Sequence, residues 1–225
     1  MKMITSNTPI VMMGSGRIIA SDVDVWPSHW PHVGVDGGGN TLMKLGRPPH
    51  LITGDLDSFV PDPTITCPII ETPDQNRTDF DKALDHLDAP VIIGLGFLSD
   101  RMDHGLSALD TIARSSKAIM LIGDNDCVCK LTTNWSMDTQ CGARISIVPW
   151  PTCTFKKSSG LRYPLTDLTL HMGERLGTSN EADATNICIE TDAGDQAALI
   201  MMEKTHQKNM LQSICPSHHI DAFQL

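Results

Sequence analysis

The first half of the chain alternates short apolar runs with segments whose apolar residues recur at helical spacing. Residues 78–87 and 102–114 are the clearest helical segments, and Thr78 is placed to cap the first. Six runs are predicted to be strands: Ile10–Met13, His32–Val35, Leu51–Thr53, Pro68–Ile70, Val91–Ile93 and Ala118–Ile122. Strands that alternate with helices form a mostly parallel sheet covered by helices. We therefore predict an α/β fold for this half.

The second half has a different pattern. After about residue 125, short runs rich in β-forming residues are separated by Gly, Pro, Asn and Asp, as in "ARISIVPW" and "NICIETD". This pattern favours an antiparallel β-sandwich. We place the boundary within residues 123–134 and predict two domains, residues 1–125 and 126–225. Residues 205–225 show no clean period and are interpreted as a loose tail or a capping segment.

Composition limits the kinds of molecule that this protein can bind and the compartment in which it works. The formal charge of −10 argues against nucleic acid, which requires a basic surface. No run approaches the roughly 18 apolar residues of a membrane helix, and the N-terminus lacks a charged-then-apolar signal pattern. Seven cysteines without a secretion signal indicate reduced thiols. We expect a cytoplasmic protein with no nucleic-acid partner and no membrane segment.

Four consecutive loops carry aspartate, and three of them also carry glycine. They are "VDGGGN" (35–40), "TGDLDSF" (53–59), "TPDQNRTDFDK" (72–82) and "GLGFLSDRMDH" (94–104), and each follows a predicted strand. Ligands bind beyond the carboxyl ends of the strands in an open parallel sheet, so these loops are expected to share one edge. The recurrence of the same residue types predicts that this edge is functional.

Within these loops, Asp55 and Asp57 stand two residues apart, so in an extended segment they point the same way. Two carboxylates this close repel unless a cation lies between them. Carboxylates, glycine loops and an arginine suit Mg²⁺ and a polyphosphate. Neither a Walker pattern nor a protein-kinase motif set is present. The alternative interpretation is a solvated turn.

Other residues expected at this edge of the sheet can also be interpreted as purely structural. Gly37–Gly39 would then be a plain turn. Asp79 would be a first-turn helix acid with Lys82 as its i+3 partner. Arg101 and Asp103 would be a surface ion pair.

Six motifs, in sequence order, resemble those of the thiamine pyrophosphokinase family: "DGGGN", "GDLDS", "TDFDKAL", "DRMDH", "SSGLRYPL" and "GTSNE". The likeness covers roughly residues 10–203. It implies an α/β ATP-binding catalytic domain followed by a β-sandwich thiamine-binding and dimerisation domain. It also implies a homodimer with active sites between subunits. The implied reaction is Mg²⁺-dependent transfer of a diphosphoryl group from ATP to the hydroxyl of thiamine, giving thiamine diphosphate and AMP.

The resemblance also implies residue roles. The metal ligands would be Asp55, Asp57 and Asp79. The catalytic set would add Arg101 and Asp103. The residues facing ATP would be Asp36, Asn40, Thr78, Lys82 and Arg101. The residues near thiamine would be Gln75, Asp103, Ser179 and Asn180.

Three positions depart from the family pattern. Ser99–Asp100 replaces a Gly-Gly pair before the arginine, and Ala108 replaces an asparagine. Residues 196–202 lack the aromatic that some members stack on the pyrimidine of thiamine. The remaining candidates to cover that ring are Met201, Met202, Trp150 and Tyr163.

Two other function classes remain open. One is a phosphatase or phosphotransferase of the DxD type, in which Asp55 would be the nucleophile. The other is a non-catalytic homologue that binds a nucleotide or thiamine without turnover.

Overall fold

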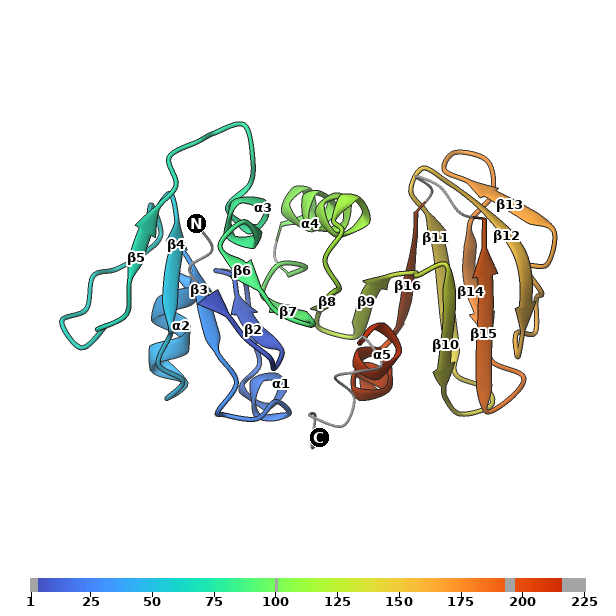
Figure 1. The fold of residues 1–225 in the computed structure, drawn as a ribbon, viewed down its shortest axis with the longest axis horizontal. Coiled ribbons are helices and arrows are strands. Elements are labelled where there is room, and N and C mark those ends of the chain that lie inside the picture. Colours follow the sequence, from blue (N-terminus) through green and yellow to red (C-terminus); the bar gives the residue numbers. More distant parts are fainter. Residues whose placement is uncertain (1–3, 100, 193–196, 216–225) are drawn as a thin grey trace. The chain divides into compact units, whose positions relative to one another are not determined.

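The computed structural model describes residues 4–99, 101–192 and 197–215 (Figure 1). The described chain divides into two compact units. The first, which we call the α/β unit, comprises residues 4–111 and 121–124. The second, the β unit, comprises residues 112–120, 125–192 and 197–215. Each unit is described by itself below.

A parallel sheet forms the centre of the α/β unit. Its strands run in the order β7-β2-β3-β4-β5, and every neighbouring pair is parallel. Their bounds are Ile10–Met13 (β2), His32–Val35 (β3), Leu51–Gly54 (β4), Ile69–Glu71 (β5) and Ile92–Leu95 (β7). All but β5 are buried at every residue, as expected for strands covered on both faces. The predicted mostly parallel α/β architecture is confirmed.

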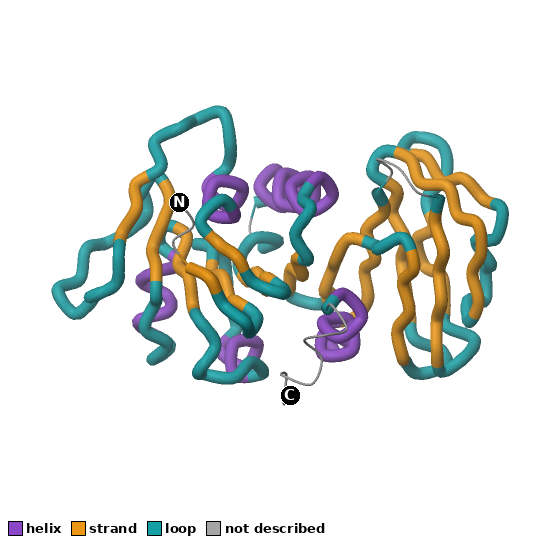
Figure 2. The backbone as a smooth tube through the Cα atoms, viewed as in Figure 1, coloured by secondary structure: helices purple, strands orange, loops and turns teal. Residues whose placement is uncertain are grey.

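Helices flank these strands (Figure 2). Their bounds are Ala20–Asp24 (α1), Gly38–Lys44 (α2), Asp79–Leu84 (α3) and Met102–Arg114 (α4). The Thr78 side chain caps α3 by accepting a hydrogen bond from the Asp81 backbone N–H at 3.3 Å. The helix ends earlier than the predicted residue 87. Leu87–Asp88 (β6) instead pairs in parallel with Ile4–Thr5 (β1), where Leu87 is fully buried.

The glycines of "VDGGGN" start a helix, so the interpretation of Gly37–Gly39 as a plain turn is wrong. A Cβ atom at Gly38 would lie 1.9 Å from the Met13 carbonyl oxygen, and one at Gly34 would lie 2.5 Å from Gly39 Cα. Glycine therefore lets α2 approach the sheet more closely than any side chain permits. Intrinsic propensity disfavours such a helix, and tertiary packing overrides it.

The β unit contains two antiparallel sheets, with strand orders β14-β11-β16-β9 and β10-β15-β12-β13. The strands are Asp126–Lys130 (β9), Asn134–Asp138 (β10), Arg144–Pro149 (β11), Thr152–Ser159 (β12), Leu168–His171 (β13), Gly177–Glu181 (β14), Asn186–Thr191 (β15) and Ala198–Glu203 (β16). Trp135, Phe155 and Ile200 are among the buried core side chains. The predicted antiparallel β architecture is confirmed. Strand β8 (Ile119–Ile122) and α4 lie where the chain divides between the units.

The segment after β16 is helical. A 3₁₀ turn, Lys204–His206 (η1), leads into α5 (Gln207–Ile214), which buries Met210, Leu211 and Ile214. The Trp135 indole N–H donates to Ser213 Oγ at 2.9 Å and ties α5 to β10. Residues 207–214 thus form a capping segment rather than a loose tail, and the end of the predicted tail, 216–225, lies outside the described residues. Among the described residues, no helix is long and apolar enough to cross a membrane.

Candidate metal and nucleotide site

Three carboxylates meet at the carboxyl edge of the parallel sheet. Asp36 directly follows β3, Asp55 directly follows β4, and Asp79 is the first residue of α3. One oxygen from each lies within 4.8 Å of the others. We call these three residues the carboxylate group. Adjacent parallel strands end at the same edge, which is why residues 19 and 24 positions apart come together.

Backbone hydrogen bonds fix the orientation of two of these carboxylates. The Leu56 N–H donates to Asp36 Oδ1 at 2.9 Å, and the Asp55 N–H donates to Asp79 Oδ1 at 3.1 Å. Asp36 and Leu56 have positive φ angles of 49° and 64°, which few non-glycine residues adopt. At Gly54, φ is 146° and a Cβ would lie 1.8 Å from Asp36 Oδ1, so no other residue fits there. The loop geometry is therefore built around the Asp36 carboxylate.

The electrostatics of the group favour a cation. Asp36 is buried, with 7% of its surface exposed. Burial raises the pKa of Asp36 to about 7, and the charges of Asp79, Asp55 and Asp57 raise it further against the opposing Leu56 hydrogen bond. The raised pKa means that the surrounding residues stabilise the charged form of Asp36 poorly. A divalent cation bound to all three residues would stabilise that charge.

Lys82 pairs with one member of the carboxylate group and is also hydrogen-bonded to the backbone. Its Nζ lies 2.7 Å from Asp79 Oδ1 and donates to the Asp74 carbonyl at 2.9 Å and to the Thr72 carbonyl. Only 5% of its surface is exposed. The i+3 pairing of Lys82 with Asp79, which we considered as the structural interpretation, is present.

Asp57 lies beside the carboxylate group but does not belong to it. It is exposed, and its N–H donates to Asp55 Oδ1 at 3.3 Å. The loop that carries both residues is held by Asn40, whose amide donates to the Val60 carbonyl at 2.6 Å while its Oδ1 accepts from the Val60 N–H at 2.8 Å. Asn40, expected to face ATP, therefore has a structural function in positioning this loop.

Arg101 and Asp103, at the start of α4, form an exposed two-point ion pair. Arg101 Nη2 lies 2.6 Å from Asp103 Oδ2, and its Nε donates to Oδ1 at 3.1 Å. The hydrogen bonds from Arg101 lower the pKa of Asp103 to about 2. In this arrangement Asp103 holds no proton at neutral pH and is a weak base. Gln75 is exposed, with its amide 3.4 Å from the Pro73 carbonyl.

The remaining expected residues lie on β14 of the β unit. Ser179 is exposed with φ of 58°, and its N–H donates to Ser146 Oγ at 3.1 Å. Asn180 is only 4% exposed, and its amide holds the backbone of Tyr163 at both the N–H and the carbonyl. The structure thus gives Asn180 a structural partner that is 17 residues away in the chain.

Positions from all three departures from the family pattern lie among the described residues, and in the third Leu199, Ile200 and Met202 are fully buried. The Ser99 hydroxyl donates to the Arg17 carbonyl at 3.1 Å, whereas Asp100 lies outside the described residues. Ala108 is buried in α4 with 3% of its surface exposed, so an asparagine there would place its amide in the interior.

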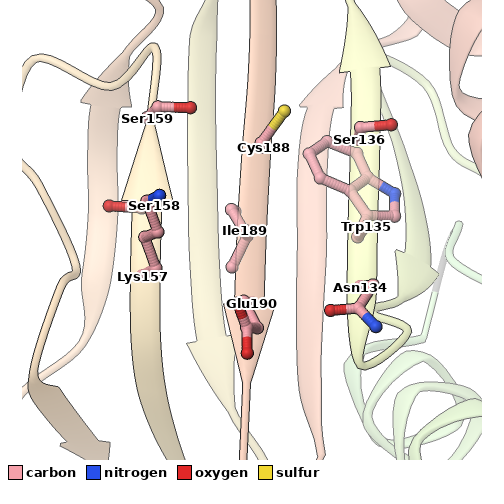
Figure 3. A pocket seen from close by; sticks show the side chains of 9 residues that line it. All are labelled: Asn134, Trp135, Ser136, Lys157, Ser158, Ser159, Cys188, Ile189 and Glu190. Carbon is pink, nitrogen blue, oxygen red and sulfur yellow. The ribbon is translucent and has the colours of Figure 1, made fainter.

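A separate hollow of about 370 Å³ lies on the β10-β15-β12-β13 sheet of the β unit (Figure 3). Residues from β10, β12 and β15 line it: Asn134, Trp135, Ser136, Lys157, Ser158, Ser159, Cys188, Ile189 and Glu190. None of the residues expected to bind metal, ATP or thiamine lines this hollow.

Sequence reasoning assigned Asp36 to ATP and missed its place among the three gathered carboxylates. The available signal was its position, directly after a strand and before three glycines, in parallel with Asp55 after the next strand.

Comparisons with known proteins agree with this fold. The model of the thiamin pyrophosphokinase catalytic domain matches residues 23–127, and that of the thiamin pyrophosphokinase vitamin B1 binding domain matches residues 132–194. Thiamin pyrophosphokinase 1 of Caenorhabditis elegans is 27% identical over 193 residues, covering 76% of this chain and 79% of the relative.

Solved structures share the fold. The thiamin pyrophosphokinase of Candida albicans has a TM-score of 0.75 at 16% identity, covering 88% of this chain and 89% of that one. The enzyme of Geobacillus thermodenitrificans has a TM-score of 0.73 at 21% identity, covering 88% and 98%. The two matched domain models follow one another along most of the sequence. They show that this chain belongs to the thiamin pyrophosphokinase family.

Proposed function

We propose that this protein transfers a diphosphoryl group from ATP to the hydroxyl of thiamine, giving thiamine diphosphate and AMP. Membership of the thiamin pyrophosphokinase family supports the reaction class. The observation that carries the proposal is the carboxylate group, in which Asp36, Asp55 and Asp79 bring oxygens within 4.8 Å of one another. Diphosphoryl transfer needs positioning and charge neutralisation more than covalent chemistry by the protein.

The carboxylate group fits Mg²⁺. Oxygen ligands are the ones Mg²⁺ prefers, and it is usually held by few carboxylates with waters and phosphate oxygens completing the shell. We propose that Asp36, Asp55 and Asp79 hold the ion, with Asp57 reaching it directly or through water. The bound ion would neutralise charge on the phosphate oxygens of ATP.

The surrounding residues prepare this site. Lys82 pairs with Asp79 and fixes its position from a buried location, rather than reaching out to phosphate. Asn40 holds the loop of Asp55 and Asp57, and Thr78 caps the helix that presents Asp79. Lys82, Asn40 and Thr78 would then act on ATP indirectly, by positioning the residues that hold the metal ion.

Arg101 and Asp103 are the exposed partners for substrate groups. We propose that Arg101 exchanges its bond to Asp103 for phosphate oxygens, which its planar guanidinium can bind at two points. Gln75 and the released Asp103 would then orient the attacking hydroxyl. The pKa of Asp103 would rise once Arg101 leaves, because the hydrogen bonds that lower it would be lost.

The proposal also covers the roles of the two domains, the assembly of the protein and its location in the cell. Residues 1–125 would form the ATP-binding catalytic domain, and residues 126–225 the thiamine-binding and dimerisation domain that contains Ser179 and Asn180. We propose a cytoplasmic homodimer whose substrates are ATP and thiamine, with neither nucleic acid nor membrane as a partner.

Incubation of the purified protein with ATP, Mg²⁺ and thiamine tests the reaction. Equimolar AMP and thiamine diphosphate are expected, and Asp55→Asn should release neither. Trapping of a phosphorylated Asp55, with phosphate released instead of AMP, would favour a DxD-type phosphotransferase. Thiamine or ATP binding without AMP would favour a non-catalytic homologue.

A further inference from the structure

A buried threonine beside the carboxylate group has no hydrogen-bond partner for its hydroxyl. Among the described residues, four buried threonine hydroxyls lack a partner, those of Thr53, Thr72, Thr111 and Thr139. Of these four, Thr53 and Thr111 are also buried as whole residues, at 0% and 2% exposure. A buried polar group without a partner has lost its hydration and gained nothing in return, which is why such groups are usually bonded to the protein, to water or to a ligand. A partner is therefore expected at Thr53.

The backbone ties Thr53 to the carboxylate group. The Thr53 carbonyl accepts the Asp36 N–H at 3.0 Å. Gly54 follows Thr53, and Asp36 Oδ1 occupies the space that a side chain at Gly54 would need. Asp55 comes next, and its N–H donates to Asp79 Oδ1 at 3.1 Å. One hydrogen bond and a two-residue step along the chain thus join Thr53 to the carboxylate group.

The side chain of Thr53 points to the face of the sheet that α3 covers. Successive residues of a strand point to opposite faces, and Ile52 faces α2, because a Cβ atom at Gly39 would lie 2.7 Å from Ile52 Cδ1. The connections from β3 to β4 and from β5 to β7 cross the sheet in opposite directions, so right-handed crossovers put α2 and α3 on opposite faces. Helix α3 packs against β3 and β4 and begins with Asp79. The Thr53 hydroxyl is therefore buried between β4 and the helix that supplies one of the three carboxylates.

The neighbouring cation is not the partner of this hydroxyl. A lysine ammonium has three N–H groups. Those of Lys82 are directed to Asp79 Oδ1 and to the carbonyls of Thr72 and Asp74. Lys82 thus has no donor left for Thr53.

Water bound to a metal ion is a partner that this site can provide. Mg²⁺ is usually held by few carboxylates and keeps several waters, which have hydrogens to donate. A threonine oxygen accepts such hydrogen bonds. Groups that hydrogen-bond to the shell around a metal commonly strengthen its binding by about 10- to 100-fold.

We propose that the Thr53 hydroxyl accepts a hydrogen bond from water in the coordination shell of Mg²⁺ at the carboxylate group, and is thereby a positioning residue for the ion. The inference rests on the metal site of the proposed function and adds a residue to it. It implies that removal of the hydroxyl weakens metal binding without weakening the metal-free protein.

Calorimetric titration of the metal-free protein with Mg²⁺, in the absence of ATP and thiamine, tests the contact. Thr53→Val replaces the hydroxyl by a methyl group of similar size and should lower the affinity for Mg²⁺ about tenfold. Thr53→Ser keeps the hydroxyl and should stay within about twofold of the wild type. Thr111→Val removes the other fully buried hydroxyl that lacks a partner, so it is the matched control and should leave the affinity unchanged.

Thermal unfolding separates this role from a structural one. In chelator, Thr53→Val should melt at or above the wild-type temperature, because the hydroxyl it removes has no partner in the protein. In millimolar Mg²⁺, the melting temperature of Thr53→Val should rise less than that of the wild type. A lower melting temperature of Thr53→Val in chelator would mean that the hydroxyl bonds to the protein itself, and would overturn the proposal.

The proposed function and the role of Thr53 can fail separately. If the wild type and Thr53→Val bind Mg²⁺ equally well, the role of Thr53 is wrong and the metal site stands. Equal losses of affinity in Thr53→Ser and Thr53→Val would also overturn it, since the serine keeps the hydroxyl. If the wild type shows no saturable Mg²⁺ binding, both the metal site and the role of Thr53 are wrong. Release of AMP and thiamine diphosphate, measured in parallel, then decides whether the proposed reaction stands.

Discussion

Replacement of Asp36 by asparagine isolates the electrostatics of the carboxylate group. Asparagine is similar in shape, its Oδ1 can still accept the Leu56 N–H, and it tolerates the positive φ of 49° at this position. The substitution therefore removes a charge and a potential metal ligand while the backbone is kept. In the metal-free protein we expect Asp36→Asn to be more stable than the wild type at pH 8.

The pKa of Asp36 sets the size and sign of this effect. In the folded protein it is raised from 3.8 to about 7, so between these values the folded state retains a proton that the unfolded state has lost. Stability of the wild type consequently falls as pH rises from about 4 to about 7. Three pH units at about 1.4 kcal/mol each set an upper limit of about 4 kcal/mol. Solvent reaches the partly exposed Asp55 and Asp79, so screening reduces the expected difference to about 1–2 kcal/mol.

Thermal unfolding at several pH values measures the difference. In chelator, Asp36→Asn should melt at the wild-type temperature near pH 4 and about 2–6 °C higher at pH 8. Millimolar Mg²⁺ should raise the melting temperature of the wild type at pH 8 and have little effect on the variant. Glu174→Gln, which removes an exposed carboxylate of the β unit, is the charge-matched control. A difference between Asp36→Asn and wild type that does not change with pH would refute the reasoning.

Three further predictions address the site, the helix cap and the assembly. Asp55→Asn and Asp79→Asn should both abolish AMP release, but only Asp79→Asn should lower stability in urea, by about 1–3 kcal/mol, because buried Lys82 loses its carboxylate partner. Equal stability of these two variants would contradict that role of Lys82. Thr78→Ala should cost about 1 kcal/mol in the same assay through loss of the α3 cap, with Thr78→Ser as the control that restores it. We expect a two-fold symmetric dimer whose contact is largely made by residues after about 130; light scattering should give the mass of a dimer, and an active monomer at micromolar concentration would rule this out.

Local features of the sequence determined much of the fold. The strands of the parallel sheet could be predicted because apolar runs of this length, separated by helical periods, have few other structures open to them. Thr78 could be assigned as a cap because capping is a contact between residues three apart. The functional edge followed from the rule that parallel strands end together, which needs only the order of strands and loops.

Short helices with weak local signals were not predictable in the same way. Helix α2 begins in glycines, which have poor helical propensity, and forms because the sheet leaves room only for glycine. Helix α5 has eight residues, and its apolar face is recognisable only once Met210, Leu211 and Ile214 are seen buried against the β unit.

The composition of the site was decided by tertiary structure. The sequence places Asp57 beside Asp55, yet the carboxylate brought into the group is Asp36, from the neighbouring strand, through a positive φ and a hydrogen bond to Leu56. Lys82 near phosphate-binding motifs suggests a phosphate ligand, but its burial makes it the partner of Asp79. Spacing along the chain determines which residues can share an edge. Which of them meet, and which of their charges remain without a partner, depends on backbone geometry and burial that arise only when distant segments pack together.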